Sequence, residues 1–299
     1  MKVLITGANG FVGKYLANYL RDKGADVRCA VRSEVKKLVN FENVVLSNMN
    51  SETNWRKAIE GIDVVIHLIA KNHTNYTNDV SKLSLYRETN VGVTEALCKS
   101  LISSKVQRLI FLSSIEVNGE TSSAGKPFDE KSKDDPKTNY GKTKLDAEKT
   151  IKNILVSSHL DYVIIRPPLI YGQVFKGNLL TLQKAIKRGL PLPFACIKNS
   201  RSLVTLENLA SLLHCCLHNN MASNKTFLVG DDARLSTPQI IKKVATDSGI
   251  TAKLFCTPKL LIKILLFVLR KRYLHPKLLY NLEVDNSLAK KLLGWKPNC

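Results

Sequence analysis

Short apolar runs alternate with amphipathic stretches through the first half of this 299-residue chain, and this alternation constrains the fold more than any other feature. Runs rich in Val and Ile predict strands at residues 2–6, 26–31, 43–46, 63–68, 107–113 and 161–166. Helical patterns lie between them at residues 11–23, 55–59, 83–103 and 139–157. Strands that are apolar almost throughout are typical of a parallel sheet covered on both faces. We therefore predict an α/β fold with a doubly wound parallel sheet.

The first expected strand runs directly into a glycine-rich turn. Gly7, Gly10 and Gly13 follow at three-residue intervals and precede an amphipathic helix. Glycines there allow a tight turn and let backbone N–H groups approach a pyrophosphate, while the helix N-terminus supplies positive potential. The spacing differs from the common GxGxxG pattern, but its place between strand and helix predicts a Rossmann-like site for NAD or NADP. We assign Phe11 and Val12 to the same cofactor site.

The end of the second expected strand bears on the choice of cofactor. An acid is usual there when the adenosine ribose of NAD is bound, whereas this chain has Arg32 followed by Ser33. The forked guanidinium of Arg32 is suited to the 2′-phosphate of NADP. A solvated surface arginine explains the residue equally well, so both cofactors stay open.

The pattern changes after residue 166, where Pro167, Pro168 and Gly172 mark a loop. Further elements are expected beyond it: helices at 178–187, 207–217 and 238–248, a strand at 225–229, and a basic helical end at 258–293. No Ser/Gly-rich linker separates the two halves. We predict a dinucleotide-binding domain at residues 1–170 and a smaller, mostly helical substrate-binding cap at residues 171–299.

A tyrosine and a lysine four residues apart are candidate catalytic groups. Tyr140 and Lys144 share one face of an expected helix, so both side chains can project into one site. A free phenol has a pKa of about 10, and we expect the ammonium to lower the pKa of Tyr140, which suits acid–base work on a sugar hydroxyl. Ser114 follows a buried-type strand whose carboxyl end faces the ligand crevice in such a sheet. We expect Ser114 to hold the oxygen whose proton Tyr140 moves.

Together these motifs resemble the extended short-chain dehydrogenase/reductases, in the NAD-dependent epimerase/dehydratase group. The resemblance covers nearly the full length and includes the glycine turn, HLIA at 67–70, TNVG at 89–92 and RPPLIYG at 166–172. It implies that Ser114, Tyr140 and Lys144 form a catalytic triad, with Lys144 also holding the nicotinamide ribose. It implies further residues at the cofactor and the cleft: Asn48, Leu68, Ala70, Asn90 and Pro167.

The second half resembles the polysaccharide-locus branch of that family, whose members act on UDP-sugars. The similar stretches are KGN at 176–178, RGLPLP at 188–193 and NSRSLV at 199–204. The resemblance implies that Asn178 and Arg201 grip the nucleotide diphosphate, and arginine pairs well with phosphate oxygens. Ser114 and Glu116 complete the expected substrate contacts.

Three positions depart from the family pattern. Asn48 stands where relatives often carry an acid near adenine, although an amide can still form a hydrogen bond there. Ile69 stands where a small residue is usual. Many epimerases have an arginine before the position of Glu283 that adds a second phosphate contact, and here Lys277 and Arg272 are the cations available.

The residue after Ser114 separates the reactions of this family. Sugar-nucleotide 4,6-dehydratases carry a proton-donating acid at the position of Ile115, so complete dehydratase activity is not expected. A 4-epimerase acting on a UDP-hexose or UDP-N-acetylhexosamine, in surface-polysaccharide precursor synthesis, ranks first. The alternative is an NAD(P)H-dependent 4-ketoreductase acting on a UDP-4-keto-6-deoxy-N-acetylhexosamine. A non-catalytic dinucleotide-binding regulator ranks third, because all three catalytic side chains are present.

Charge favours anionic partners without choosing among them. The chain has 45 Lys and Arg against 25 Asp and Glu, a formal net charge of +20. The cations are spread over nearly every element and no basic groove interleaved with aromatic residues is evident, so nucleic acid is not an expected partner. By resemblance, a homodimer forms through the helices at 83–103 and 139–157.

Cysteine usage and apolar segments bear on the compartment. The seven cysteines form no CxxC pair, so we expect no metal site and reduced thiols in a cytoplasmic protein. The amino terminus lacks the pattern of a secretory signal. The apolar stretch at 260–269 is about half the ~20 residues of a spanning helix, so stable membrane insertion is not expected. Residues 258–272 form either a helix of the cap, which is preferred, or an interfacial helix with a basic end.

Overall fold

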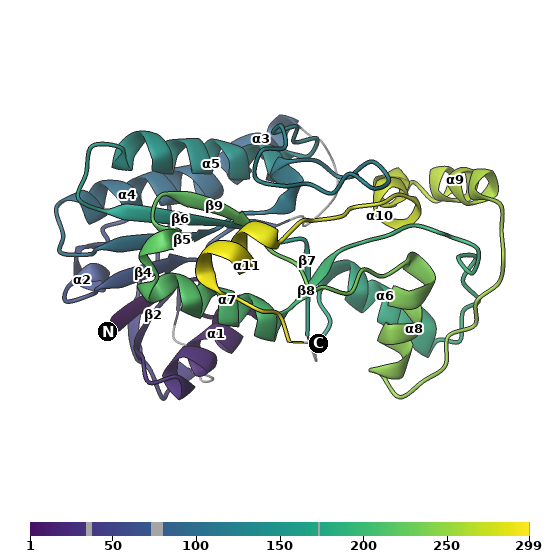
Figure 1. Cartoon of the computed structure of the whole chain (residues 1–299), viewed down its shortest axis with the longest axis horizontal. Helices are drawn as coiled ribbons and strands as arrows, with labels where there is room; N and C mark the ends of the chain where they lie inside the picture. The colour runs from purple at the N-terminus through teal and green to yellow at the C-terminus, as the bar shows by residue number, and fades with distance from the viewer. Residues whose placement is uncertain (34–37, 73–79, 173, 299) are drawn as a thin grey trace.

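A seven-stranded parallel sheet forms the centre of the larger part of the molecule (Figure 1). The computed structural model describes residues 1–33, 38–72, 80–172 and 174–298. Within these residues the strand order is β3-β2-β1-β4-β5-β6-β9, the order of a doubly wound Rossmann-like sheet. The strands are β1 (Lys2–Thr6), β2 (Asp26–Val31), β3 (Glu42–Val45), β4 (Val64–His67), β5 (Arg108–Leu112), β6 (Asp161–Arg166) and β9 (Lys225–Leu228). The predicted fold class and the strand positions are confirmed.

Helices cover both faces of this sheet because alternate strand residues point to opposite sides. Val3 and Ile5 face one hydrophobic cluster, whereas Leu4 between them faces another. The first face is covered by α1 (Phe11–Asp22), α7 (Leu206–His218) and α11 (Ser287–Leu293). The second face is covered by α2 (Arg56–Ile59), α4 (Val93–Ile102) and α5 (Asn139–Leu155).

The long helix expected at 83–103 has an interruption. It consists of α3 (Val80–Arg87), a π-helical turn at Glu88–Gly92, and α4. A π-turn widens the helix locally and often marks a functional position. Here it holds the buried side chain of Asn90 against the end of β4.

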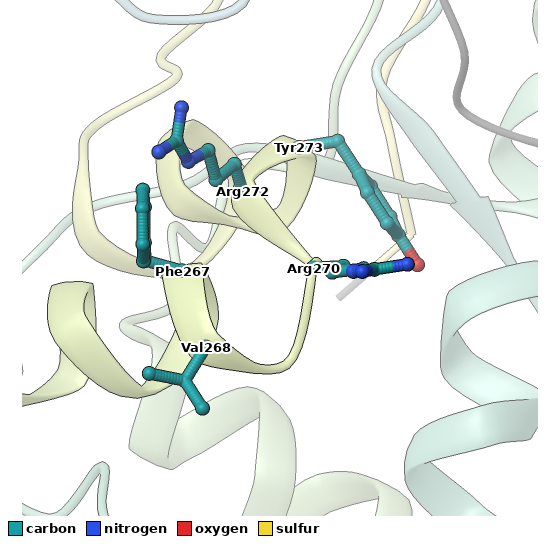
Figure 2. Close-up of a pocket in the computed structure, with 5 residues that line it drawn as sticks. All are labelled: Phe267, Val268, Arg270, Arg272 and Tyr273. Atoms are coloured by element: carbon teal, nitrogen blue, oxygen red, sulfur yellow. The ribbon is translucent and has the colours of Figure 1, made fainter.

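The cap is a second helical layer with its own apolar core, at the right in Figure 1. Its helices are α6 (Gly177–Lys187), α8 (Thr237–Thr246), α9 (Lys259–Val268) and α10 (His275–Leu279). A small parallel sheet of β7 (Leu169–Tyr171) and β8 (Leu203–Thr205) lies between the cap and the main sheet, and the sequence analysis did not identify it. The end of α9 and the turn after it line a pocket (Figure 2).

The chain returns to the main sheet after residue 170. β9 pairs with β6, and both α7 and α11 pack on the first face of the sheet. The described cap is therefore assembled from segments on either side of this return. Whether residues 1–170 and 171–299 fold as separate units stays a prediction.

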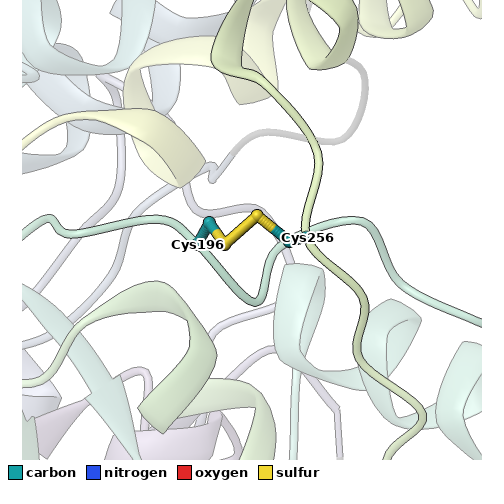
Figure 3. Close-up of a disulfide and its surroundings, with 2 residues drawn as sticks. All are labelled: Cys196 and Cys256. Carbon is teal, nitrogen blue, oxygen red and sulfur yellow. A yellow bond between two sulfur atoms is a disulfide. The ribbon is translucent and has the colours of Figure 1, made fainter.

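A disulfide joins Cys196 to Cys256 within the cap (Figure 3). The expectation that all thiols are reduced is therefore wrong for this pair. The Phe255 N–H donates to the Leu192 carbonyl oxygen, and the Ala195 N–H donates to the Phe255 carbonyl oxygen. These backbone hydrogen bonds join two segments that are distant in sequence and hold the two cysteine Cα atoms 5.0 Å apart. Four described cysteines are free thiols: Cys29, Cys98, Cys215 and Cys216.

Loss of this disulfide is expected to lower the stability of the cap. The bond closes a loop with a sequence separation of 60 residues, and loops of that size typically gain about 2–4 kcal/mol from cross-linking. Cys256→Ser should lower the free energy of unfolding in urea by that amount. Cys215→Ser, at a half-buried free thiol, is the matched control. A reductant should destabilise the native chain but not Cys256→Ser, and equal sensitivity of both would contradict the prediction.

Candidate active site

Three neighbouring strands deliver the candidate residues to one edge of the sheet. β1 lies beside β4, and β4 beside β5, with Thr6 opposite His67 and His67 opposite Phe111 in the register. The glycine turn follows β1, residues 68–70 follow β4, and Ser114 follows β5. Because these strands are parallel, all three segments emerge at their carboxyl ends, where doubly wound sheets bind ligands.

The glycine turn has the shape that a bound pyrophosphate requires. Gly7 has φ +68°, and a Cβ on it would lie 3.2 Å from the backbone of Ile69. A Cβ on Gly13 would lie 2.5 Å from the carbonyl oxygen of Gly7. No side chain caps α1 at Gly10, so an anion can occupy the helix N-terminus. The turn therefore fits the diphosphate of a dinucleotide.

The other expected cofactor residues lie around this turn with different exposures. Phe11 and Val12 begin α1 and are half-buried. Leu68 and Ala70 are half-buried at the end of β4, and Pro167 is buried after β6. Arg32 and Asn48 are exposed beyond the ends of β2 and β3.

Asn90 acts as a link between elements. Its Oδ1 accepts a hydrogen bond of 2.7 Å from the Lys71 backbone N–H, and its Nδ2 donates to Thr143 Oγ1 at 3.0 Å. The side chain is 1% exposed. Asn90 thus ties the segment after β4 to α5, one residue before Lys144.

Ser114 and Tyr140 are brought together, as expected. Their side chains share a hydrogen bond, although they come from the end of β5 and the first turn of α5. Thr138 caps α5, and its hydroxyl accepts from the Gly141 backbone N–H at 2.9 Å. Backbone atoms of Glu116 lie 2.7 Å from where a Cβ on Gly141 would be, so Gly141 lets α5 approach this loop closely.

The pKa of Tyr140 departs from the sequence expectation. Burial and the nearby Glu116 carboxylate raise the pKa of Tyr140, and the hydrogen bond from Ser114 opposes them only in part. The predicted lowering of this pKa is therefore wrong for the chain by itself. The physical reason is that burial removes the phenol from water and the Glu116 carboxylate disfavours a second negative charge beside it.

Lys144 is 1% exposed and lies under the site. Burial lowers the pKa of its ammonium to about 7, against the opposing effect of Glu148 one turn further along α5. Its Nζ lies 3.9 Å from the ring centroid of Phe111 on β5. Burial and the charge of Lys144 also lower the pKa of His67 to about 3, so that buried imidazole is neutral.

A buried ionic network fixes α5 against the sheet, and the sequence analysis missed it. Glu148 accepts hydrogen bonds from Ser113 and from the guanidinium of Arg166, whose side chain is 5% exposed. Arg166 also donates to Asn118 Oδ1 at 3.1 Å and Asp134 Oδ1 at 2.9 Å. The one available signal was the spacing of Glu148 four residues after Lys144.

Glu116 connects the sheet to the cap. Its Oε1 accepts from Lys277 Nζ of α10 at 3.2 Å, and its Oε2 accepts from the Thr138 hydroxyl at 2.7 Å. The sequence offered Lys277 as a cation for a second phosphate contact. In the structure its ammonium is paired with the carboxylate of Glu116, two residues after Ser114. This pair therefore holds α10 over the Tyr140 side of the site.

The two expected diphosphate ligands are in different settings. Arg201 is 9% exposed, and its Nη1 donates to the carbonyl oxygens of Pro276 and Tyr280 at 3.2 and 2.9 Å. Burial lowers the pKa of Arg201 to about 10, while Glu120 and Glu116 oppose this effect. Asn178 is half-buried in the first turn of α6. The charge of Arg201 thus interacts with Glu116, whereas Asn178 lies on a different element of the cap, α6.

The glycine turn, the parallel sheet and the Ser114–Tyr140 pair with buried Lys144 define a dinucleotide-dependent enzyme of the short-chain dehydrogenase/reductase type. The chain belongs to the NAD dependent epimerase/dehydratase family, whose model matches residues 3–230.

Two named relatives and one solved structure are similar to this chain over most of its length. The chain is 35% identical over 299 residues to a UDP-glucose 4-epimerase of Vibrio cholerae, covering 99% of this chain and 90% of that protein. It is 28% identical over 246 residues to the N-acetyl-alpha-D-glucosaminyl-diphospho-ditrans,octacis-undecaprenol 4-epimerase of Escherichia coli O157:H7, covering 81% and 71%. The structure of UDP-glucuronic acid 4-epimerase from Bacillus cereus in complex with NAD superposes with a TM-score of 0.79 at 22% identity, covering 100% of this chain and 94% of that one. The last likeness shows the fold.

Among the described residues, no helix is long and apolar enough to cross a membrane.

Proposed function

We propose that the chain is a 4-epimerase of a UDP-hexose or UDP-N-acetylhexosamine, working in precursor synthesis for a surface polysaccharide. The observation that carries the proposal is the hydrogen bond between Ser114 and Tyr140, with Lys144 buried one turn further along α5. These groups suit reversible proton transfer at a sugar hydroxyl. The names of the V. cholerae and E. coli relatives, both 4-epimerases, support the same reaction.

In the proposed reaction the ionised form of Tyr140 takes the proton of the C4 hydroxyl while Ser114 holds that oxygen by a hydrogen bond. A bound nicotinamide supplies the reversible hydride acceptor, a chemistry that no side chain of the protein provides. Tyr140 returns the proton to the C4 oxygen once the sugar has presented its other face. Asn178 and Arg201 would hold the diphosphate during this turnover, and Gly7 and Gly13 would admit the cofactor's pyrophosphate.

The test is an assay with several substrates. Purified protein is incubated with UDP-glucose, UDP-N-acetylglucosamine and a UDP-4-keto-6-deoxy-N-acetylhexosamine, each with and without NADH or NADPH, and products are identified by NMR. We expect the C4 epimer without added reductant. A further sample with an N-acetylglucosaminyl diphospho-polyprenol tests the sugar carrier in the name of the E. coli relative. No epimer from any of these sugars would overturn the proposal.

The second candidate is the 4-ketoreductase, favoured by Arg32. This cation lies exposed beyond the end of β2, where the 2′-phosphate of NADPH would approach. Consumption of NADPH only in the presence of the keto sugar would select this activity. Dehydration is not proposed, because Ile115 is 2% exposed and packs with Leu228, Leu282 and Val284. The non-catalytic regulator is disfavoured by the same three side chains that support the epimerase.

Glu116→Gln is expected to shift the pH dependence of this activity. The Glu116 carboxylate raises the pKa of Tyr140, because it disfavours a second negative charge nearby. Removing that charge lowers the pKa of Tyr140, so the rise of kcat with pH should move to lower pH. Glu120→Gln is the matched control, since Glu120 acts on Arg201 and is not among the groups that shift Tyr140. A profile that moves equally in both variants would contradict this role.

We propose a homodimer formed through the helical segments at residues 83–103 and 139–157, and a cytoplasmic location, where nucleotide sugars and nicotinamide cofactors are available. Light scattering of the purified protein tests the first, with a mass of two chains expected. Cell fractionation tests the second. The Cys196–Cys256 bond would then have to persist in a reducing compartment, which labelling of thiols in intact cells would measure.

A further inference from the structure

Helix α9 presents an apolar face that the rest of the described chain does not cover. Only Ile262 and Leu266 face the core of the cap, at 0% and 5% exposure. The large apolar side chains around them are between 44% and 69% exposed: Leu260, Leu261, Ile264, Leu265, Phe267, Val268 and Leu269. At 100° per residue these positions span about 200° of the helix circumference. Contiguous exposed apolar surface of this kind marks an interaction site.

The surroundings of this face are strongly basic. The sequence contains no Asp or Glu between Asp247 and Glu283. Exposed cations lie at both ends of α9 and, in the case of Lys263, within it: Lys259, Lys263, Arg270, Lys271 and Arg272. An apolar face bordered by Lys and Arg is the pattern of a helix that lies in the plane of a membrane interface. Anionic lipid headgroups supply the complementary charge.

The turn after α9 brings apolar and basic side chains together. Its pocket is lined by Phe267, Val268, Arg270, Arg272 and Tyr273 (Figure 2). The Arg272 guanidinium lies 3.8 Å from the centroid of the Phe267 ring, so a charged group and an apolar group reach the same surface. Tyr273 adds an aromatic side chain with a polar tip, a type enriched at membrane interfaces.

A second copy of this chain is a poorer occupant than a membrane. Two such faces in contact would bring the same cations together without an acid between them, and like charges across an interface are costly. α9 also lies at the outer end of the cap, far from the main sheet, where a flat surface can reach it (Figure 1).

We propose that α9 is an interfacial helix that docks this protein reversibly on an anionic lipid bilayer. Its exposed apolar side chains enter the boundary between headgroups and acyl chains, and the flanking cations contact the headgroup phosphates. Ile262 and Leu266 remain in the cap and keep the helix attached to it. The docking is peripheral, and it holds whichever sugar the active site accepts.

The test is flotation of the full chain with vesicles of phosphatidylcholine alone or mixed with phosphatidylglycerol. We expect flotation with the anionic vesicles, little with the neutral ones, and weaker binding as salt is raised. Ile264→Glu should lower the partition coefficient at least 10-fold. Val156→Glu, at an exposed apolar residue after α5 (77% exposed, against 51% for Ile264), is the matched control and should bind as the unaltered chain does.

A triple substitution distinguishes attraction of lipid by the cations beside α9 from attraction by the net charge of the whole protein. Replacing Arg270, Lys271 and Arg272 by Gln should lower the partition coefficient about 100-fold, at about fivefold per cation. The same change at exposed Lys105, Lys149 and Lys152 alters net charge equally and should have a small effect. Turnover of a water-soluble substrate should be unchanged in Ile264→Glu, so a failed docking test leaves the proposed activity separately measurable.

Two results would overturn the proposal. One is equal flotation of Ile264→Glu and the unaltered chain. The other is absence of flotation with the anionic vesicles. If light scattering then showed that Ile264→Glu dissociates an oligomer, α9 would be a contact between two copies of the chain.

Discussion

Tyr140→Phe is expected to lower kcat by at least about 100-fold, because in the proposed mechanism the phenol oxygen moves the substrate proton. The change removes one oxygen from a side chain that is hydrogen-bonded to Ser114 and near Glu116. It leaves the ring, the Thr138 cap of α5 and the buried Lys144 in place. Cofactor binding should therefore stay within about twofold of the unaltered chain, so that the loss appears in turnover. Steady-state kinetics and a titration with NAD separate the two quantities.

Tyr162→Phe is the matched control. Tyr162 lies near the amino end of β6, away from the carboxyl ends of the strands that carry the site. The substitution removes the same phenol hydroxyl as Tyr140→Phe does. We expect its kcat to be unchanged. If Tyr140→Phe retained full activity, the proton-transfer mechanism would be wrong even if epimerisation itself were observed.

Gly13→Ala is expected to abolish measurable cofactor binding. Its new Cβ would lie 2.5 Å from the Gly7 carbonyl oxygen and 2.7 Å from the Ala8 Cα, and both are backbone atoms. The turn must therefore move, and the N-terminus of α1 moves with it. Alanine is the better helix former by about 1 kcal/mol, but overpacking costs about 1–3 kcal/mol. The net effect on unfolding should be smaller than the effect on binding.

Gly230→Ala tests whether that loss is local. A Cβ at Gly230 would meet its nearest neighbours at 3.6 Å, which is ordinary contact. We expect near-native NAD affinity by calorimetry and a near-native urea midpoint. NAD binding by Gly13→Ala with unaltered affinity would show that the glycine turn does not hold the cofactor.

The parallel sheet was predictable because its signal is local. Residues 2–6 and 161–166 are apolar enough to be buried on both faces, and β1 and β6 occupy those same bounds. β7 and β8 were missed because each has three residues and they pair across a long stretch of chain. The interruption at Glu88–Gly92 was missed because a π-turn of five residues is too short to change the helical pattern over residues 83–103.

The candidate site was predictable only in its residue types. A helical spacing of four relates Tyr140 to Lys144, and Ser114 follows a buried strand, so their convergence could be expected. The pKa of Tyr140 could not be expected, because burial and the position of Glu116 decide it. The pairing of Lys277 with Glu116 spans 161 residues and has no sequence signal.

The sequence by itself determined the α/β sheet, the glycine turn and the candidate catalytic side chains, since each is identified from a short local pattern of residues. Tertiary structure alone decided what those side chains experience: the burial of Lys144, the Arg166–Glu148 network beneath α5 and the cap contact at Glu116. It also decided which apolar residues of α9 are covered and which are left outside, and it brought Cys196 to Cys256. The physical reason is that burial and electrostatics are properties of neighbours in space, and in this fold those neighbours come from distant parts of the chain.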